Sequence, residues 1–84
     1  MKHAGPAALD HLEPLLRALR KIEGLKEKSR GVFYRSGKAF LHFHEHGDEF
    51  YADVRLASDF ELHPVNKRSE RTILLKKVKA ALKC

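Results

Sequence analysis

The chain has 84 residues, of which 43% are apolar and 33% are charged, and its formal net charge is +6. This length allows one domain with a thin core, and the composition is typical of a folded globular protein. No apolar run approaches the roughly 18 residues that a membrane-spanning helix needs, and the first residues lack the apolar stretch of a signal peptide. Cys84 is the only cysteine, so we expect no internal disulfide, an exposed thiol at this position and a cytoplasmic protein.

Two segments have the apolar spacing of amphipathic helices. The first is predicted over residues 11–23, with Asp10 as its N-cap, Pro14 in its first turn and Gly24 as its stop. The second is predicted over residues 69–82, capped by Ser69 or Asn66. We therefore expect a flexible segment over residues 1–8 and a single domain over residues 9–84.

Between these helices the apolar period changes from 3.6 to 2, which predicts strands. Residues 31–56 form a three-strand meander in this interpretation, with two-residue turns at Ser36-Gly37 and Gly47-Asp48. Phe60 and Leu62 indicate a short fourth strand that ends at Pro64.

The two turns fix a register and therefore two faces of the sheet. The second turn pairs Leu41 with Val54 and Phe43 with Ala52, and all four are apolar. By the same reasoning the first turn adds two residues to this core face, Val32 and Tyr34. We predict a two-layer α+β domain, in which an N-terminal and a C-terminal helix pack on one face of an antiparallel sheet of three to four strands.

The opposite, outer face carries a candidate metal site. His42 and His44 are two residues apart on one strand, roughly 7 Å between Cα atoms, and Asp53 lies across from His42 in the predicted register. Two imidazoles and a carboxylate suit a divalent metal such as zinc. The alternative is that these are ordinary outward-facing residues, with His42 and Asp53 forming a cross-strand polar pair.

Aromatic and basic side chains share the outer face in the same register: Phe33, Arg35, Lys38, Phe40, Tyr51 and Arg55. Such a mixture resembles the stacking platforms that bind single-stranded nucleic acid, and the positive net charge attracts phosphate backbones. It equally suits a protein partner or a homodimer that covers the sheet. A third possibility is that Phe33 and Phe40 only contact one another across the hairpin, or that the chain after residue 57 covers them.

Catalysis has little support in the sequence. No nucleophile elbow, phosphate-binding glycine loop or paired-cysteine motif is present. His42 beside Asp53 could form an oriented general base, but the sequence places no serine or cysteine to serve as its nucleophile. The working hypothesis is a non-enzymatic binding or protein-interaction module that uses the outer face, and the alternative is a nucleic-acid-binding or divalent-metal-binding domain that uses the same face.

Three stretches also resemble a known family pattern. These are Leu19-Arg-Lys-Ile-Glu-Gly24, Val32-Phe-Tyr-Arg-Ser-Gly-Lys-Ala-Phe40 and Asp48-Glu-Phe-Tyr-Ala-Asp-Val54. Together with the closing helix, residues 15–82 are similar to small conserved bacterial proteins of unassigned function, and distantly to the MmcQ/YjbR-like family. The resemblance implies an α+β fold of DNA-binding-like architecture, and it carries no functional residue over to this chain.

Overall fold

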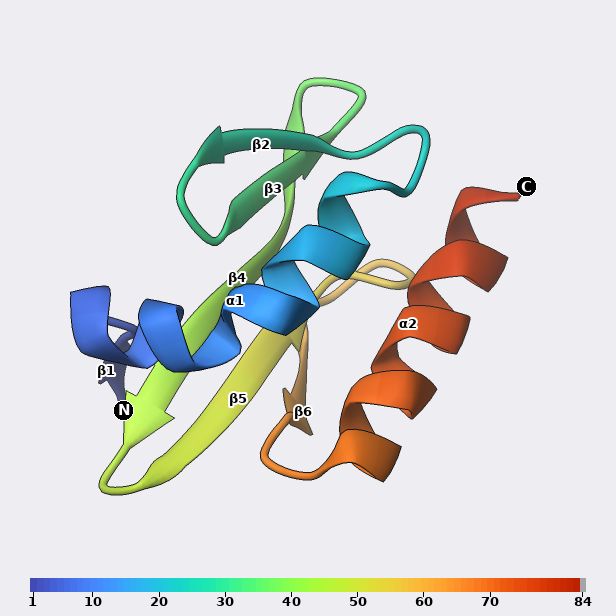
Figure 1. The fold of residues 1–84 in the computed structure, drawn as a ribbon. Coiled ribbons are helices and arrows are strands. Elements are labelled where there is room, and N and C mark those ends of the chain that lie inside the picture. Colours follow the sequence, from blue (N-terminus) through green and yellow to red (C-terminus); the bar gives the residue numbers. More distant parts are fainter. Residues whose placement is uncertain (84) are drawn as a thin grey trace.

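The computed structural model describes residues 1–83, so the thiol predicted to be exposed at Cys84 lies outside the described residues. The described residues form six strands and two helices: β1 (Lys2–His3), α1 (Pro6–Arg20), β2 (Lys26–Ser29), β3 (Val32–Arg35), β4 (Lys38–His46), β5 (Glu49–Val54), β6 (Glu61–Pro64) and α2 (Arg68–Leu82). Figure 1 shows α1 crossing one face of the sheet, with α2 beside it.

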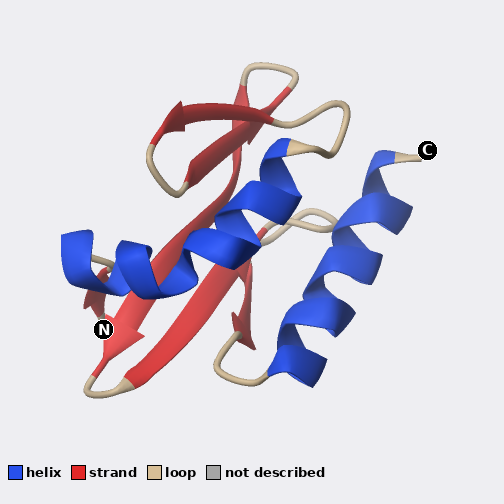
Figure 2. Ribbon diagram, in the orientation of Figure 1, coloured by secondary structure: helices blue, strands red, loops and turns tan. Residues whose placement is uncertain are grey.

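All strands belong to one antiparallel sheet in the order β2-β3-β4-β5-β6, and β1 pairs with the far end of β4. Both helices contribute to a single core against this sheet, which confirms the predicted α+β class (Figure 2). The sheet has more strands than the predicted three to four. The sequence does not predict β2, because Lys26-Glu-Lys-Ser is polar throughout. It does not predict β1, because two residues are too few to show a periodic pattern.

Helix α1 begins at Pro6 and ends at Arg20, whereas the sequence predicts residues 11–23 with Asp10 as the N-cap. Gly5 is the N-cap, and Pro6 suits the first helical position because its φ angle is already helical. Pro14 therefore lies inside the helix, where it removes one backbone hydrogen bond. The ribbon of α1 changes direction part-way along its length, as expected at an internal proline (Figure 1).

Helix α2 lies where the sequence predicts it, within one residue at its start. Its N-cap is Lys67, and the carboxylate of Glu70 accepts hydrogen bonds from the backbone N–H groups of Lys67 and Asn66, at 2.8 and 3.0 Å. The predicted caps are therefore wrong. The Asn66 side chain instead accepts a 2.7 Å hydrogen bond from the Phe50 backbone N–H, which fixes the start of α2 to β5.

The second hairpin has the predicted register. Leu41 pairs with Val54 and Phe43 with Ala52, and all four side chains are buried. The predicted fourth strand is also present as β6, which ends at Pro64 as expected.

The first hairpin has the predicted turn but then departs from the predicted register. Tyr34 pairs with Ala39, whereas the next pair is Phe33 with Leu41, so Phe40 is an extra residue in β4. Such a β-bulge breaks the alternation of side chains between the two faces. Phe33 and Phe40 are only 1% and 3% exposed, so the prediction that they lie on the outer face is wrong.

The bulge also makes the predicted core face of β3 wrong. Val32 and Tyr34, predicted to lie on the core face beyond the turn, are only partly buried. Lys28 lies over the Tyr34 ring, 5.5 Å from its centroid. The core takes Phe33 and Phe40 in their place.

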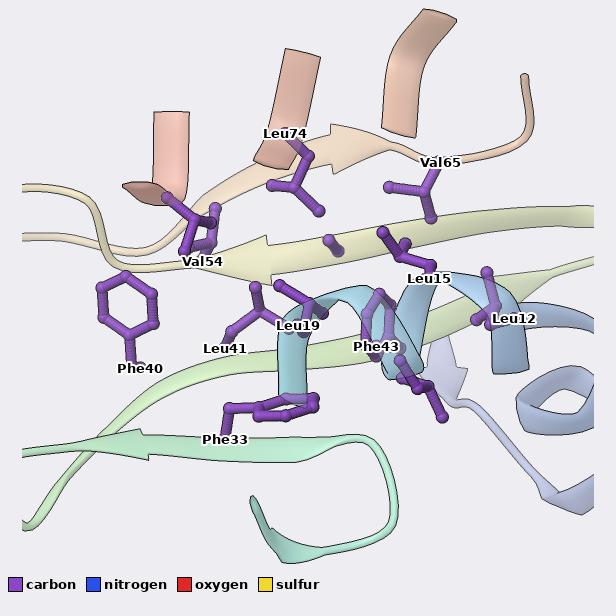
Figure 3. Packing of buried hydrophobic residues seen from close by; sticks show 13 residues of the cluster. Leu12, Leu15, Leu19, Phe33, Phe40, Leu41, Phe43, Val54, Val65 and Leu74 are labelled. Atoms are coloured by element: carbon purple, nitrogen blue, oxygen red, sulfur yellow. The ribbon is translucent and has the colours of Figure 1, made fainter. Parts of the chain in front are cut away.

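The core lies between the sheet and the two helices (Figure 3). Its members are Leu12, Leu15, Leu16, Leu19, Phe33, Phe40, Leu41, Phe43, Ala52, Val54, Val65, Leu74 and Val78. Burying a leucine or phenylalanine side chain contributes about 1.5–3 kcal/mol, so this cluster holds both helices on one face of the sheet. The histidines of β4, on the opposite face, take no part in this core. Within residues 1–83, neither helix has the length and apolar character needed to cross a bilayer.

Candidate metal site on the outer face of the sheet

Strand β4 directs His42 and His44 away from the helices, because they alternate with the buried Leu41 and Phe43. Asp53 pairs with His42 across β5, as the sequence predicts. One carboxylate oxygen of Asp53, Oδ2, lies 3.3 Å from His42 Nε2 and 3.4 Å from His44 Nε2. The structure therefore brings all three predicted metal-site residues together.

His3 joins this group from the start of the chain. In the β1–β4 pairing it lies opposite His44, and its ring centroid is 4.9 Å from that of His44 and 5.5 Å from that of His42. Potential ligand atoms of the three histidines all lie within 4.8 Å of one another. We call His3, His42, His44 and Asp53 the histidine cluster.

Three further contacts hold β1 in this position. The Ala4 backbone N–H donates to the Phe43 carbonyl at 3.0 Å, and the Gly5 N–H donates to a carboxylate oxygen of Glu45 at 2.7 Å. Lys2 Nζ lies 3.8 Å from the other oxygen of the same carboxylate. The sequence does not predict the place of His3, because residues 1–8 are expected to be flexible and no periodic pattern links them to β4.

Phe60 covers one side of the cluster. Its ring lies against His42 with the centroids 5.4 Å apart, and the guanidinium of Arg55 stacks over the same ring at 5.2 Å. Phe60 belongs to the connection between β5 and β6, so this segment covers part of the outer face. An apolar ring beside an imidazole limits the access of water to it.

The environment of His42 favours its neutral imidazole. Burial lowers the pKa of His42, the charge of Asp53 opposes this shift, and the neighbouring His44 and His3 add to the lowering. A neutral imidazole has a free lone pair, which is the form that binds metals. In addition, His44 Nδ1 is buried and has no hydrogen-bond partner within residues 1–83. A buried polar atom without a partner costs free energy, so the cluster has unused bonding capacity.

The other predicted outer-face residues separate into two groups. Arg35, Lys38 and Arg55 line a pocket beside the turn that joins β3 and β4. Tyr51 stays near the outer face, where its hydroxyl donates to Glu49 at 3.4 Å, and burial together with Glu49 raises the pKa of Tyr51. Because Phe33 and Phe40 are in the core, the aromatic platform predicted for nucleic acid or for a partner lacks two of its members.

The donor set fits a transition metal better than a hard cation. Imidazole nitrogen is a preferred ligand of zinc, copper and nickel, whereas calcium and magnesium prefer oxygen ligands. Three imidazoles and one carboxylate supply the four ligands of a closed tetrahedral zinc site.

Searches of protein-family models, of curated proteins and of solved structures gave no match to this chain. The resemblance to the MmcQ/YjbR-like family therefore stays a prediction, and the function has to be argued from the site itself.

Proposed function

We propose that this domain is a non-enzymatic binding module that holds one divalent transition metal ion, of the zinc type, in the histidine cluster. The observation that carries this proposal is the convergence of three imidazoles, whose ligand atoms lie within 4.8 Å of one another. Zinc–nitrogen bonds of about 2.0–2.1 Å place tetrahedral ligand atoms about 3.3 Å apart. Small side-chain rotations of His3, His42 and His44 would close that difference.

Asp53 is the fourth ligand in this proposal. Its Oδ2 atom lies within 3.4 Å of the Nε2 atoms of both His42 and His44, so a metal bound to these nitrogens would also reach the carboxylate. The negative charge of Asp53 would offset half of the charge of a divalent ion, which lowers the electrostatic cost of the half-buried site.

A site with four protein ligands has no position for a substrate or for an activated water molecule, which favours a binding role over catalysis.

The ligand set also uses no thiol. We propose a cytoplasmic location, since the fold relies on no disulfide and Cys84 is its only cysteine.

Isothermal titration calorimetry with ZnCl₂ at pH 7.5, on protein purified without an oligohistidine tag, tests the proposal. The wild-type chain should bind one ion, and His44→Ala should weaken binding by about 100-fold or more, since one of four ligands is lost. His46→Ala is the matched control, because His46 lies on the same strand but outside the cluster. Equal affinities of His44→Ala and the wild type would refute the proposal.

The pH dependence of the same titration gives a second check. Protons compete with the metal for each imidazole, so the affinity should decline as the pH falls below about 6.5, the ordinary pKa of histidine. The lowered pKa of His42 means that this residue contributes to the decline later than an exposed histidine would. An affinity that stays constant from pH 7.5 to 5 would argue against imidazole ligands.

A further inference from the structure

A second candidate site lies away from the histidine cluster, where the turn between β3 and β4 faces the chain that follows β5. A pocket of about 480 Å³ is present here, and Arg35, Lys38 and Arg55 line it together with the hydroxyl-bearing Ser36 and Ser58. No carboxylate is among the described residues that line this pocket. Its polar lining therefore consists of cations and hydroxyl groups, which are the groups that bind oxyanions.

Among residues 1–83, none of the three cations has an acidic partner. Arg20 and Arg30, elsewhere on the surface, form ion pairs with carboxylates, but no ion pair of Arg35, Lys38 or Arg55 occurs within residues 1–83. Arg35 and Lys38 are moreover directly opposite one another in the β3–β4 pairing. Like charges in that arrangement destabilise a hairpin, so the fold gains nothing from placing them together.

Arg55 is held in place before any ligand binds. Its Nη2 atom donates to the Ala39 carbonyl, and its guanidinium stacks on the Phe60 ring. A guanidinium has five N–H donors, so the remaining donors stay available. A cation fixed in this way loses little conformational entropy when it binds an anion.

We propose that this pocket binds a phosphate group. Arginine and lysine recognise phosphate through charge-assisted hydrogen bonds, and the two serine hydroxyls supply further donors. The group could belong to a small phosphorylated molecule or to the backbone of a single-stranded nucleic acid, because both present the same charged oxygens. The proposal uses none of the histidine-cluster residues, so it stands or falls independently of zinc binding.

The test is a titration of ¹⁵N-labelled protein with sodium pyrophosphate, and separately with a 12-nucleotide oligodeoxythymidylate, both without added metal. The amide signals of Ser36, Lys38 and Ser58 should shift with either probe if the pocket takes phosphate. Lys38→Ala should weaken binding about tenfold, since one charge-assisted contact is lost. Its melting temperature should not fall, because the substitution relieves the repulsion with Arg35.

The matched control is Lys76→Ala, which removes the same charge from the exposed side of α2. Pyrophosphate binding that depends on Lys38 supports a small phosphorylated ligand, and tighter binding of the oligonucleotide that also depends on Lys38 supports the nucleic-acid backbone. If Lys76→Ala weakens binding as much as Lys38→Ala does, or if Lys38→Ala binds both probes like the wild type, the proposed pocket is wrong.

Discussion

Two groups of neighbouring titratable side chains in this domain differ in how many of their polar atoms have hydrogen-bond or ion-pair partners. Between α1 and β2, the Glu13 carboxylate contacts Arg20 at 2.6 Å and Arg30 at 3.0 Å, and Glu27 accepts hydrogen bonds from Arg20 and from the Gly31 backbone. In the histidine cluster, by contrast, one carboxylate oxygen of Asp53 contacts two imidazoles, and His44 Nδ1 has no hydrogen-bond partner among the described residues. We call the first group the arginine network.

We interpret this difference as one between a structural role for the arginine network and the proposed binding role of the histidine cluster. The guanidiniums of Arg20 and Arg30 hold the pKa of Glu13 at about 2, so the arginine network is fully charged at neutral pH and is complete without a ligand. In the histidine cluster the pKa of His42 is lowered instead, which leaves its lone pair free. A complete network contributes to the fold, whereas the histidine cluster, in which His42 favours its neutral form, is the site that we propose for a metal.

The largest change in stability that we expect follows from removing the Glu27 side chain. Its carboxylate joins α1 to the turn after β2 through Arg20 and the Gly31 N–H, with hydrogen bonds of 2.9 and 3.1 Å among them. Glu27→Ala should lower the free energy of unfolding by about 1–2 kcal/mol, because a partly buried charge-assisted pair and a backbone partner are lost together. Urea unfolding monitored by circular dichroism measures this change.

Zinc affinity provides the contrast for the same variant. Glu27→Ala should bind zinc as the wild type does, because the arginine network contributes no ligand and lies on another part of the fold. His44→Ala is the reciprocal variant, with impaired zinc binding and a stability close to that of the metal-free wild type. A Glu27→Ala protein that remains folded yet loses zinc would show that the two regions are not separate.

A smaller effect should appear in acid. The folded-state pKa of Glu13 is lowered from 4.5 to about 2, so its contribution to stability is complete above about pH 4.5 and is lost as the pH falls toward 2. Glu13→Gln should therefore be less stable than the wild type at pH 6, and the gap should narrow between pH 4.5 and 2. Urea midpoints at several pH values test this, and a gap that does not change with pH would contradict it.

The sequence predicts much of this architecture because the second hairpin follows strict rules. The alternation of Leu41, His42, Phe43 and His44, together with the turn at Gly47-Asp48, is enough to place Asp53 beside the two histidines. Helix α2 is predictable for the same reason, since its apolar spacing is regular.

The remaining features depend on interactions that no local pattern encodes. The β-bulge at Phe40 inserts one residue into β4, and because side chains alternate with a period of two, that single residue moves Phe33 from the outer face to the core. His3 reaches the cluster through a two-residue strand, whose pairing with β4 depends on long-range contacts such as the one between Gly5 and Glu45. A regular sequence pattern reveals neither feature.

The most direct test of the central claim is a two-bond ¹H–¹⁵N correlation spectrum of the six histidine side chains, recorded before and after one equivalent of ZnCl₂. We predict that the ring nitrogens of His3, His42 and His44 change together and saturate at one equivalent, whereas those of His11, His46 and His63 do not change. A spectrum in which all six histidines respond weakly and without saturation, or in which His3 does not respond, would contradict the proposed site.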